Sequence, residues 1–483
     1  MQVSEEVLKR AVERCREKRI LIPTFAQQRN PELIPEKVKQ RLQSVGLWDV
    51  DPINLFRITW KNEPVDKGGL FGKGNYIEFP PDFTGVPARI IGLVGKYFPT
   101  GAHKVGAAFG CLVPRLVTGQ FDPTRNKAVW PSTGNYCRGG AFDSALLGCT
   151  AVAILPEEMS RERFEWLENI GAEVIATPGC ESNVKEIYDK CWEIRETRPD
   201  CVIFNQFEEF GNAIWHYHET GGIIEEIYNS LGGEKNLASF VSATGSAGTV
   251  AAGDYLRRNF SFIKVVVCEA LQCPTLYQFG FGGHRIEGIG DKHVPWIHNV
   301  RNSDMVCAVD DEQCMSLLRL FNEQPGQSYL AEELSEELVQ KLPLLGISSI
   351  CNLIASIKTA RYYEMDSNDV IFTCLTDSAE MYTSRLTELC AERGEYTREQ
   401  AIADKAKYLD GCVTDHMREL NHFDQKALHN FKYFTWVEQQ GKSVGELNEL
   451  WNPGFWEQKF SLVDEWDQYI EEFNRRTGVL DLL

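Results

Sequence analysis

Short apolar segments alternate with segments of helical periodicity between about residues 88 and 385, and this alternation limits the chain to few folds. Strands that alternate with helices favour parallel sheets joined by right-handed crossovers. We therefore expect an α/β fold in which ligands bind beyond the carboxyl ends of the strands. The predicted strands are 128–130, 150–155, 173–176, 240–241, 264–268 and 370–372, with helices at 139–148 and from residue 160 to about 169.

The two flanks of this region differ from it in composition. Residues 1 to about 85 are polar and interrupted by prolines. From about residue 391 the chain is acidic, helical in pattern and rich in aromatic residues, namely Phe431, Tyr433, Phe434, Trp436, Trp451, Phe455 and Trp456. So many aromatic side chains need a surface to cover them, which is either the main body, a second subunit or the mouth of an active site.

Composition narrows the function. The 483 residues carry a formal net charge of −19, which disfavours nucleic acid and anionic membranes as partners. The 15 cysteines are odd in number and include no C-x-x-C pair, as expected of a reduced, cytoplasmic protein. No apolar run is long enough to span a membrane, and no H-E-x-x-H or similar pattern predicts a metal site.

Lys104 has unusual neighbours. Residues 99–101 have the composition of a helix start, and Val, Gly, Ala, Ala, Phe and Gly follow the lysine. We expect Lys104 one turn into a helix, with a buried stem. A buried lysine has a lowered pKa and can attack an aldehyde. The alternative is a core-helix lysine whose ammonium reaches solvent.

Three loops carry polar groups that could bind one ligand. Residues 131–135 follow a predicted strand and could bind a carboxylate through hydroxyls and backbone amides at a helix start. Residues 244–249 are small and could cradle a phosphate. Residues 346–349, expected at a strand-to-helix junction, could contact a ring nitrogen through their hydroxyls. Each loop alone is also compatible with a simple capping turn. Together with the lysine they describe pyridoxal phosphate acting on an amino acid.

Further segments agree with this interpretation, at 205–208, 216–221, 283–290 and 377–382. With the lysine and the three loops, they occur in the order found in the fold-type II pyridoxal-phosphate enzymes. The chain resembles this family over roughly residues 88 to 385, and most closely the cysteine synthase and cystathionine β-synthase group.

Some motifs vary from that group. Residues 102–104 are closer to the tryptophan synthase β pattern, and the Ser-Thr-Gly-Asn order at 132–135 is closer to threonine synthase. Tyr136 stands where cysteine synthases have a small threonine, which implies a reshaped substrate pocket.

The resemblance implies two three-layer α/β domains with mostly parallel sheets, as in tryptophan synthase β. We expect an N-terminal extension at 1–85 and an N-terminal α/β domain at 86–205 that carries the lysine and the carboxylate loop. A C-terminal α/β domain at 206–390 would carry the phosphate loop, and residues 391–483 would form a helical extension.

The resemblance also assigns site residues. Lys104 would be the catalytic lysine that binds the cofactor aldehyde, Asn135 would contact the ring hydroxyl, and Ser349 would face the ring nitrogen. The remaining cofactor-binding residues would be His103, Gly245, Ser246, Ala247, Gly248 and Thr249, and the substrate-binding residues Ser132, Thr133, Gly134, Tyr136, Gln206 and Gly288.

The implied reaction is β-elimination or β-replacement on a small L-amino acid, such as cysteine or an O-activated serine, through an aminoacrylate intermediate. Alternatives are a threonine synthase-like or ammonia-lyase reaction, or a non-catalytic cofactor-binding protein that acts on a partner. The expected cofactor is pyridoxal 5'-phosphate, and the expected assembly is a homodimer.

Overall fold

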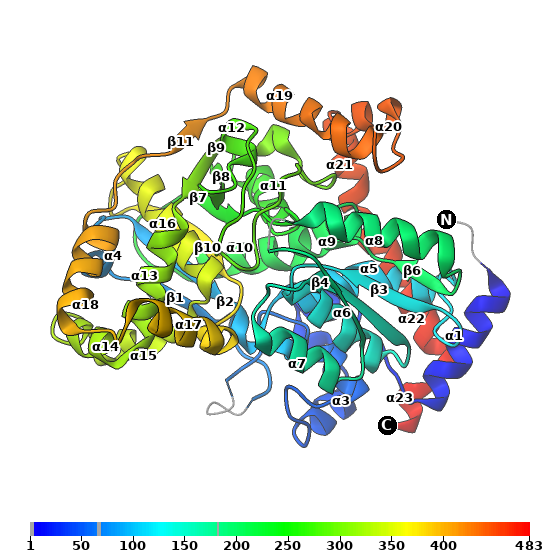
Figure 1. Cartoon of the computed structure of the whole chain (residues 1–483). Helices are drawn as coiled ribbons and strands as arrows, with labels where there is room; N and C mark the ends of the chain where they lie inside the picture. Colours follow the sequence, from blue (N-terminus) through cyan, green and yellow to red (C-terminus); the bar gives the residue numbers. More distant parts are fainter. Residues whose placement is uncertain (1–3, 65–68, 181–182) are drawn as a thin grey trace.

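Two sheets organise the molecule (Figure 1). The computed structural model describes residues 4–64, 69–180 and 183–483, so residues 1–3 and 65–68 of the expected N-terminal extension lie outside it. The larger sheet has the order β1 (Tyr76–Phe79), β2 (Arg89–Val94), β10 (Asp369–Leu375), β7 (Asn236–Ala243), β8 (Lys264–Ala270), β9 (Met305–Val309) and β11 (Met417–Glu419). The smaller sheet has the order β5 (Glu173–Thr177), β4 (Thr150–Pro156), β3 (Lys127–Pro131) and β6 (Cys201–Ile203).

The strand pairing confirms the predicted parallel α/β architecture. All neighbours in the smaller sheet are parallel, as are the five central strands of the larger one. Only the edge strands β1 and β11 pair antiparallel. Every strand expected from the apolar pattern is present. A strand that is covered on both faces needs apolar residues on both, so it stands out in the sequence as a continuous apolar run.

Sheet membership differs from the expected boundaries at three points. Strand β2 falls within the range 86–205, yet it pairs with β10 of the larger sheet, with Ile90 opposite Ile371. Strand β1 of the expected N-terminal extension and β11 of the expected helical extension also join that sheet. Apolar alternation predicts that a segment is a strand, whereas its partner depends on contacts distant in sequence.

Helices cover both sheets (Figure 1). Those before residue 231 are α1 (Glu5–Glu17), α2 (Phe25–Arg29), α3 (Glu36–Leu42), α4 (Pro81–Thr84), α5 (Lys104–Val117), α6 (Asn135–Leu146), α7 (Arg161–Asn169), α8 (Val184–Thr197), α9 (Phe210–Trp215) and α10 (Gly221–Ser230). A π-helical turn at His216–Thr220 joins α9 to α10. The next helices are α11 (Ala251–Asn259), α12 (Thr275–Gln278), α13 (Asp311–Asn322), α14 (Gln324–Leu330), α15 (Glu336–Lys341), α16 (Ile347–Tyr362) and α17 (Thr383–Arg393).

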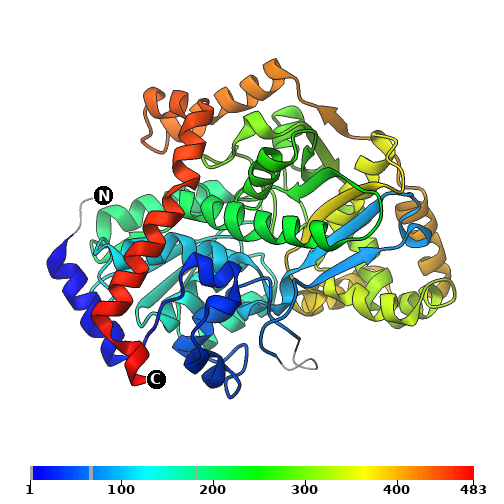
Figure 2. The same cartoon turned by 180° about the vertical axis from the view of Figure 1, so that it is seen from behind.

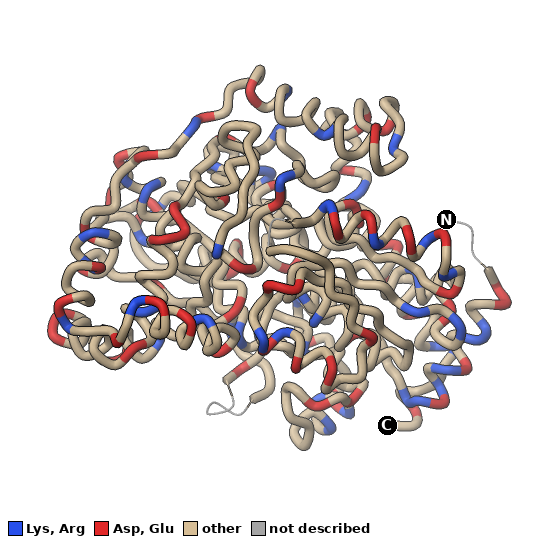
Figure 3. Tube along the Cα trace, in the orientation of Figure 1, with Lys and Arg blue, Asp and Glu red and all other residues tan. Residues whose placement is uncertain are grey.

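The remaining helices belong to the C-terminal region. They are α18 (Arg398–Asp404), α19 (His422–Lys432), α20 (Val444–Glu449), α21 (Pro453–Phe460), α22 (Leu462–Thr477) and α23 (Val479–Leu482). No single helix in the described ranges is long and apolar enough to cross a membrane, although the bent pair 336–344 and 347–362 has the length and composition for it. Acidic and basic residues are interspersed along the trace (Figure 3).

Close helix packing places the start of α5. A Cβ built on Gly211 of α9 would lie 2.2 Å from the carbonyl oxygen of Gly110 on α5, and one on Gly139 of α6 would lie 2.8 Å from the Val105 backbone. Only glycine permits such approaches, because any side chain would overlap the facing backbone. These contacts hold α5 between α6 and α9, with the N-termini of α5 and α6 near each other.

The C-terminal extension packs on the main body. Trp436 and Trp456 are buried, and the Trp436 indole N–H donates to the carbonyl oxygen of Val294 at 2.9 Å. Lys432 is also buried, and its ammonium donates to the carbonyl oxygens of Trp296 (3.0 Å) and His298 (2.7 Å). Of the seven aromatic side chains of the extension, Trp436 and Trp456 are thus buried, Phe431, Tyr433, Trp451 and Phe455 are half-buried, and Phe434 is exposed.

Helix α22 extends this contact across the back of the molecule. It packs beside α5 and α1, as Figure 2 shows. The Asp467 carboxylate accepts the backbone N–H groups of Phe25 (2.6 Å) and Ala26 (3.0 Å) at the start of α2. The extension therefore ties the N-terminal segment to the domain that carries Lys104.

The α5–α9 contact can be tested by Gly211→Ala. The added methyl group would force the two helices apart, so we expect the free energy of unfolding to fall by about 1–3 kcal/mol. Gly222→Ala is the matched control, because the nearest atom to its Cβ is the Arg29 Cδ at 3.5 Å. Thermal and denaturant unfolding of both variants would measure the difference. Equal midpoints would contradict the importance of the glycine contact.

Candidate active site

Lys104 is the first residue of α5, with His103 as the N-cap, so it lies one turn earlier in the helix than expected. The preceding turn reverses direction through Thr100 and Gly101, whose φ angles of 68° and 70° are left-handed. Lys104 is buried, as its apolar neighbours indicated. Burial lowers the pKa of its ammonium to about 8. The Nζ atom lies 3.1 Å from Ser246 Oγ, across the gap between the two domains.

A small cavity surrounds the lysine and draws on both domains. Its lining comprises Lys104, Ser132, Thr133, Asn135, Tyr136, Gln206, Phe207, Gly245, Ser246, Gly288, Ile289 and Gly290. Most residues predicted for the site therefore meet at one place. The others that were predicted do not line the cavity: His103, Gly134, Ala247, Gly248 and Thr249 belong to the same segments as lining residues, whereas Ser349 belongs to the third loop, which contributes no lining residue.

The predicted carboxylate loop joins β3 to α6. Ser132 Oγ accepts the Gly134 N–H at 3.0 Å, and Asn135 is the first residue of the helix. Backbone N–H groups at the start of a long helix lack intrahelical acceptors and favour an anion. Tyr136 follows them, buried with its ring edge-to-face on Trp130 at 5.4 Å. The loop thus has the donors that a carboxylate needs, and an aromatic ring limits the space beside them.

The predicted phosphate loop follows β7. A Cβ on Gly245 would lie 3.3 Å from the Gly288 carbonyl oxygen, and one on Gly248 would lie 1.9 Å from Asn212 Oδ1. Between them Ala247 is left-handed, with a φ of 61°, which costs an alanine roughly 1 kcal/mol. The loop therefore needs small residues, because neighbouring parts of the chain fill the space that larger side chains would take.

His103 contacts the predicted phosphate loop without lining the cavity. Its Nε2 lies 3.3 Å from Thr249 Oγ1, and its ring packs against Trp60 and His216 at centroid distances of 5.5 and 4.9 Å. Burial and the neighbouring Lys104 charge lower the pKa of His103 well below its usual value, so the imidazole is neutral at neutral pH. The histidine is placed to orient the loop, away from the cavity itself.

The third loop differs from expectation in its setting. It follows helix α15 and a short 3₁₀ turn, and Gly346 is the N-cap of α16, so no strand precedes it. Ser349 Oγ donates to the Asp377 carbonyl oxygen at 3.3 Å. Ser348 Oγ has no hydrogen-bond partner among the described residues and lies 3.7 Å from a Cβ built on Gly288. Ser348 thus joins Ser349 as a candidate for the ring-nitrogen contact.

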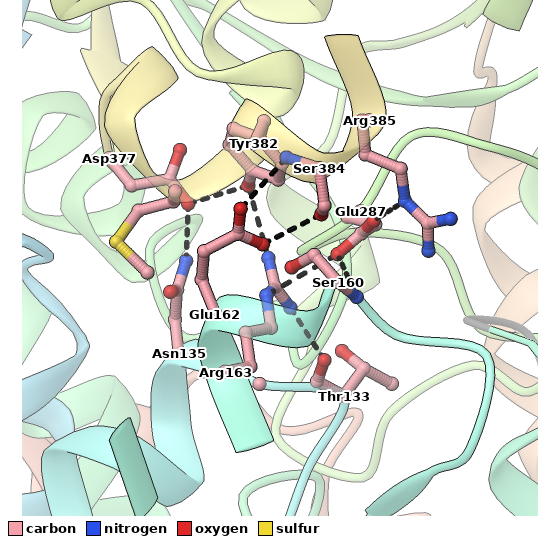
Figure 4. Close-up of polar contacts among 12 residues, drawn as sticks. Thr133, Asn135, Ser160, Glu162, Arg163, Glu287, Asp377, Tyr382, Ser384 and Arg385 are labelled. Atoms are coloured by element: carbon pink, nitrogen blue, oxygen red, sulfur yellow. Dashed lines mark hydrogen bonds and ion pairs between the residues drawn. The ribbon is translucent and has the colours of Figure 1, made fainter. Parts of the chain in front are cut away.

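Asp377 is a site residue to which sequence reasoning assigned no role. Its carboxylate is fully buried and accepts hydrogen bonds from Asn135 Nδ2 and the Tyr382 hydroxyl, both at 2.7 Å (Figure 4). Burial raises the pKa of this carboxyl. Arg163 was also missed, because nothing in a polar helical pattern distinguishes a buried arginine from an exposed one. Glu287, in a loop, and Asn212, in α9, were likewise assigned no role.

These residues fit the expected cofactor. Its aldehyde needs a buried amine, which Lys104 supplies, and its phosphate needs a small-residue loop at a strand end. Its ring needs polar partners, and Asn135 Oδ1 and Ser348 Oγ are buried without partners among the described residues. In the same described ranges, no three His, Cys, Asp or Glu side chains are grouped as metal ligands.

Known proteins are similar to this chain in sequence and in fold. Residues 96–328 match the family described as pyridoxal-phosphate dependent enzyme. Cysteine synthase B of Campylobacter jejuni is 30% identical over 287 residues, which cover 59% of this chain and 87% of that protein. A probable cysteine synthase of Bacillus subtilis is 29% identical over 288 residues, covering 59% and 85%.

Among solved structures, a hydrogen sulfide-producing enzyme of Fusobacterium nucleatum has a TM-score of 0.55 and 25% identity, covering 69% of this chain and 90% of that one. The buried lysine, the two anion loops and these similarities lead to one conclusion. The chain belongs to the pyridoxal-phosphate-dependent enzyme family that includes the cysteine synthases.

Proposed function

We propose that the protein catalyses β-replacement or β-elimination on a small L-amino acid, such as cysteine or an O-activated serine. The observation that carries this proposal is the position of the Lys104 amine, in one cavity with the Ser132–Asn135 loop and the 245–249 loop. Bound pyridoxal phosphate supplies an electron sink for the α-carbon of the amino acid. The relatives named cysteine synthase and the hydrogen sulfide-producing neighbour support the same class of reaction.

The chain's own residues bind and orient the substrate and the cofactor and transfer the proton. The loop at 132–135, with Gln206, binds and orients the substrate carboxylate, and residues 245–249 hold the cofactor phosphate. Lys104 Nζ acts as the general base that takes the α-proton, because burial keeps a useful fraction of the amine neutral near pH 8. The hydroxyl of Ser349 or Ser348 faces the ring nitrogen. With a neutral hydroxyl at its ring nitrogen, the cofactor stabilises a carbanion at the α-carbon less than it would with a carboxylate there. This favours reactions in which a β-substituent departs.

We also propose a homodimer in the cytoplasm. Several aromatic side chains remain on the surface around α12 and α19, including Phe281 (77% exposed) and Phe434 (55% exposed), and a partner subunit could cover them. Apart from Cys180, the cysteines are free thiols within the described ranges, as a reducing compartment would keep them. Sedimentation of the purified protein tests the dimer, and a monomer at micromolar concentration would contradict it.

Replacing Lys104 tests the cofactor site. Lys104→Ala removes the only group proposed to bind the cofactor aldehyde, so we expect the purified protein to lose its visible cofactor absorbance and its turnover. Lys185→Ala is the control, because Lys185 is exposed and its ion pair within the described part of the chain is with Asp189 on its own helix. Circular dichroism would verify that both variants fold. Undiminished visible absorbance in Lys104→Ala would rule out the assignment.

An amino-acid panel identifies the substrate class. The holoenzyme is mixed with L-cysteine, O-acetyl-L-serine, L-serine and L-threonine, and the visible spectrum and released sulfide, ammonia and pyruvate are followed. We expect the first two to change the spectrum and to react, and L-serine to bind and change the spectrum without releasing products. A response to L-threonine alone would favour a threonine synthase-like or ammonia-lyase reaction. A response to none would favour a non-catalytic binding protein.

The pKa of Lys104 predicts how cofactor capture depends on pH. Its pKa is lowered from 10.5 to about 8, so the neutral amine becomes the major form above about pH 8 rather than above 10.5. The rate at which apoprotein captures pyridoxal phosphate should rise about tenfold per pH unit between about pH 6 and 7 and level off above pH 8. Stopped-flow absorbance would measure this rate. A simple alkylamine is the control, and a protein profile that keeps rising like that of the alkylamine would contradict the lowered pKa.

A further inference from the structure

Arg163 connects the two domains beside the active site (Figure 4). It lies in the first turn of α7, and none of its side chain is exposed. Its guanidinium contacts three different segments, namely the carboxylate loop, the loop that contains Gly288, and the segment after β10. A fully buried charge is unusual for a helix of otherwise polar pattern and points to a specific role.

The first contact is with the carboxylate loop. Arg163 Nη1 donates to the Thr133 carbonyl oxygen at 2.5 Å. A loop that binds an anion through its N–H groups must turn its carbonyl oxygens away, because a carbonyl oxygen facing the anion would repel it. The guanidinium holds Thr133 in that orientation. It occupies the space of a side chain at residue 134, since a Cβ on Gly134 would lie 1.9 Å from Nη1.

The second contact is with Glu287, which directly precedes Gly288 of the cavity lining. Arg163 Nε lies 3.3 Å from Glu287 Oε2, and the carboxylate is 3% exposed. Glu287 also accepts from Arg385 Nε at 2.5 Å and from the Ser160 backbone N–H at 3.3 Å. The carboxylate compensates the buried guanidinium and fixes the Gly288 loop to the start of α7.

The third contact reaches Asn135 indirectly. Arg163 Nη2 donates to the Tyr382 hydroxyl oxygen at 3.0 Å, and that hydroxyl donates to Asp377 Oδ2. Asn135 Nδ2 donates to the same carboxylate oxygen at 2.7 Å. One guanidinium therefore influences both ends of the carboxylate loop, at Thr133 directly and at Asn135 through two intermediates.

We propose that Arg163 is a positioning residue that shapes the 132–135 loop for the substrate carboxylate and joins it to the Gly288 loop across the domain gap. The proposal rests on the proposed function, because it assumes a carboxylate in that loop. The planar fork of arginine donates in several fixed directions, which a lysine ammonium at this position could not reproduce. A second link acts in parallel, since Glu162 accepts from the Ser384 backbone N–H (2.8 Å) and hydroxyl (2.7 Å).

The test compares L-serine with ethanolamine, which keeps the amine and hydroxyl but lacks the carboxylate. Both are titrated into holoenzyme and followed by the visible absorbance of the cofactor, so no turnover is needed. In Arg163→Gln we expect L-serine to bind on the order of 10²-fold more weakly, as for a displaced binding group, with ethanolamine binding and cofactor affinity unchanged. Arg163→Lys should keep the charge and much of the thermal stability, yet fail to restore the preference for L-serine.

Arg161→Gln is the matched control, because Arg161 is 80% exposed on the same helix and, among the described residues, its ion pair is with Glu165. If Arg163→Gln does not fold, Tyr382→Phe removes the hydroxyl and its two hydrogen bonds, to Arg163 and to Asp377, at nearly constant shape and should weaken L-serine binding about 2- to 10-fold.

Three outcomes would overturn the proposal. The first is an unchanged serine-to-ethanolamine ratio in Arg163→Gln, or in Tyr382→Phe where that variant replaces it. The second is an equal loss of both ligands together with the cofactor, which would indicate a purely structural role. The third is full restoration of the ratio by Arg163→Lys, which would contradict the role proposed for the planar guanidinium. A wild-type protein that does not prefer L-serine would instead refute the proposed carboxylate site, and with it any role for Arg163 in shaping that site.

Discussion

The contact between α5 and α9 at Gly110 and Gly211 sets the geometry on which the site depends. With no side chain between them, the helices approach until backbone meets backbone, and α6 approaches α5 in the same way at Gly139. Lys104 and Asn135 begin two of these helices, so their positions follow from the packing. A lysine fixed in this way loses water, and that loss lowers the pKa of its amine.

Buried cationic side chains occur at the site and near it, and each is stabilised by different groups. Lys104 has the Ser246 hydroxyl and a lowered pKa, whereas Arg163 has the carboxylate of Glu287. Lys432 of the extension donates to two carbonyl oxygens, and burial lowers its pKa to about 7. Through these contacts the extension fixes residues 294–298, which follow the cavity-lining residues 288–290 in the chain.

Much of the site could be predicted from the sequence. The buried lysine and the small-residue loops at 131–135 and 244–249 are local patterns, and the structure brings them to one cavity. The third loop was harder, because the adjacent hydroxyls of Ser348 and Ser349 look equivalent until the fold shows which has a partner. Arg163 could not be predicted, since its helix carries polar residues typical of an exposed surface.

The sequence by itself determined six of the strands, namely β3, β4, β5, β7, β8 and β10, and indicated which residues have the chemistry for pyridoxal phosphate, because periodicity and residue type are local properties. The tertiary structure alone decided that β2 and β11 join the larger sheet and that the aromatic extension covers the body. It also decided that Asp377 and Glu287 meet Asn135 and Arg163 across the domain gap. These outcomes depend on contacts between residues far apart in the chain, where burial and charge compensation select one arrangement.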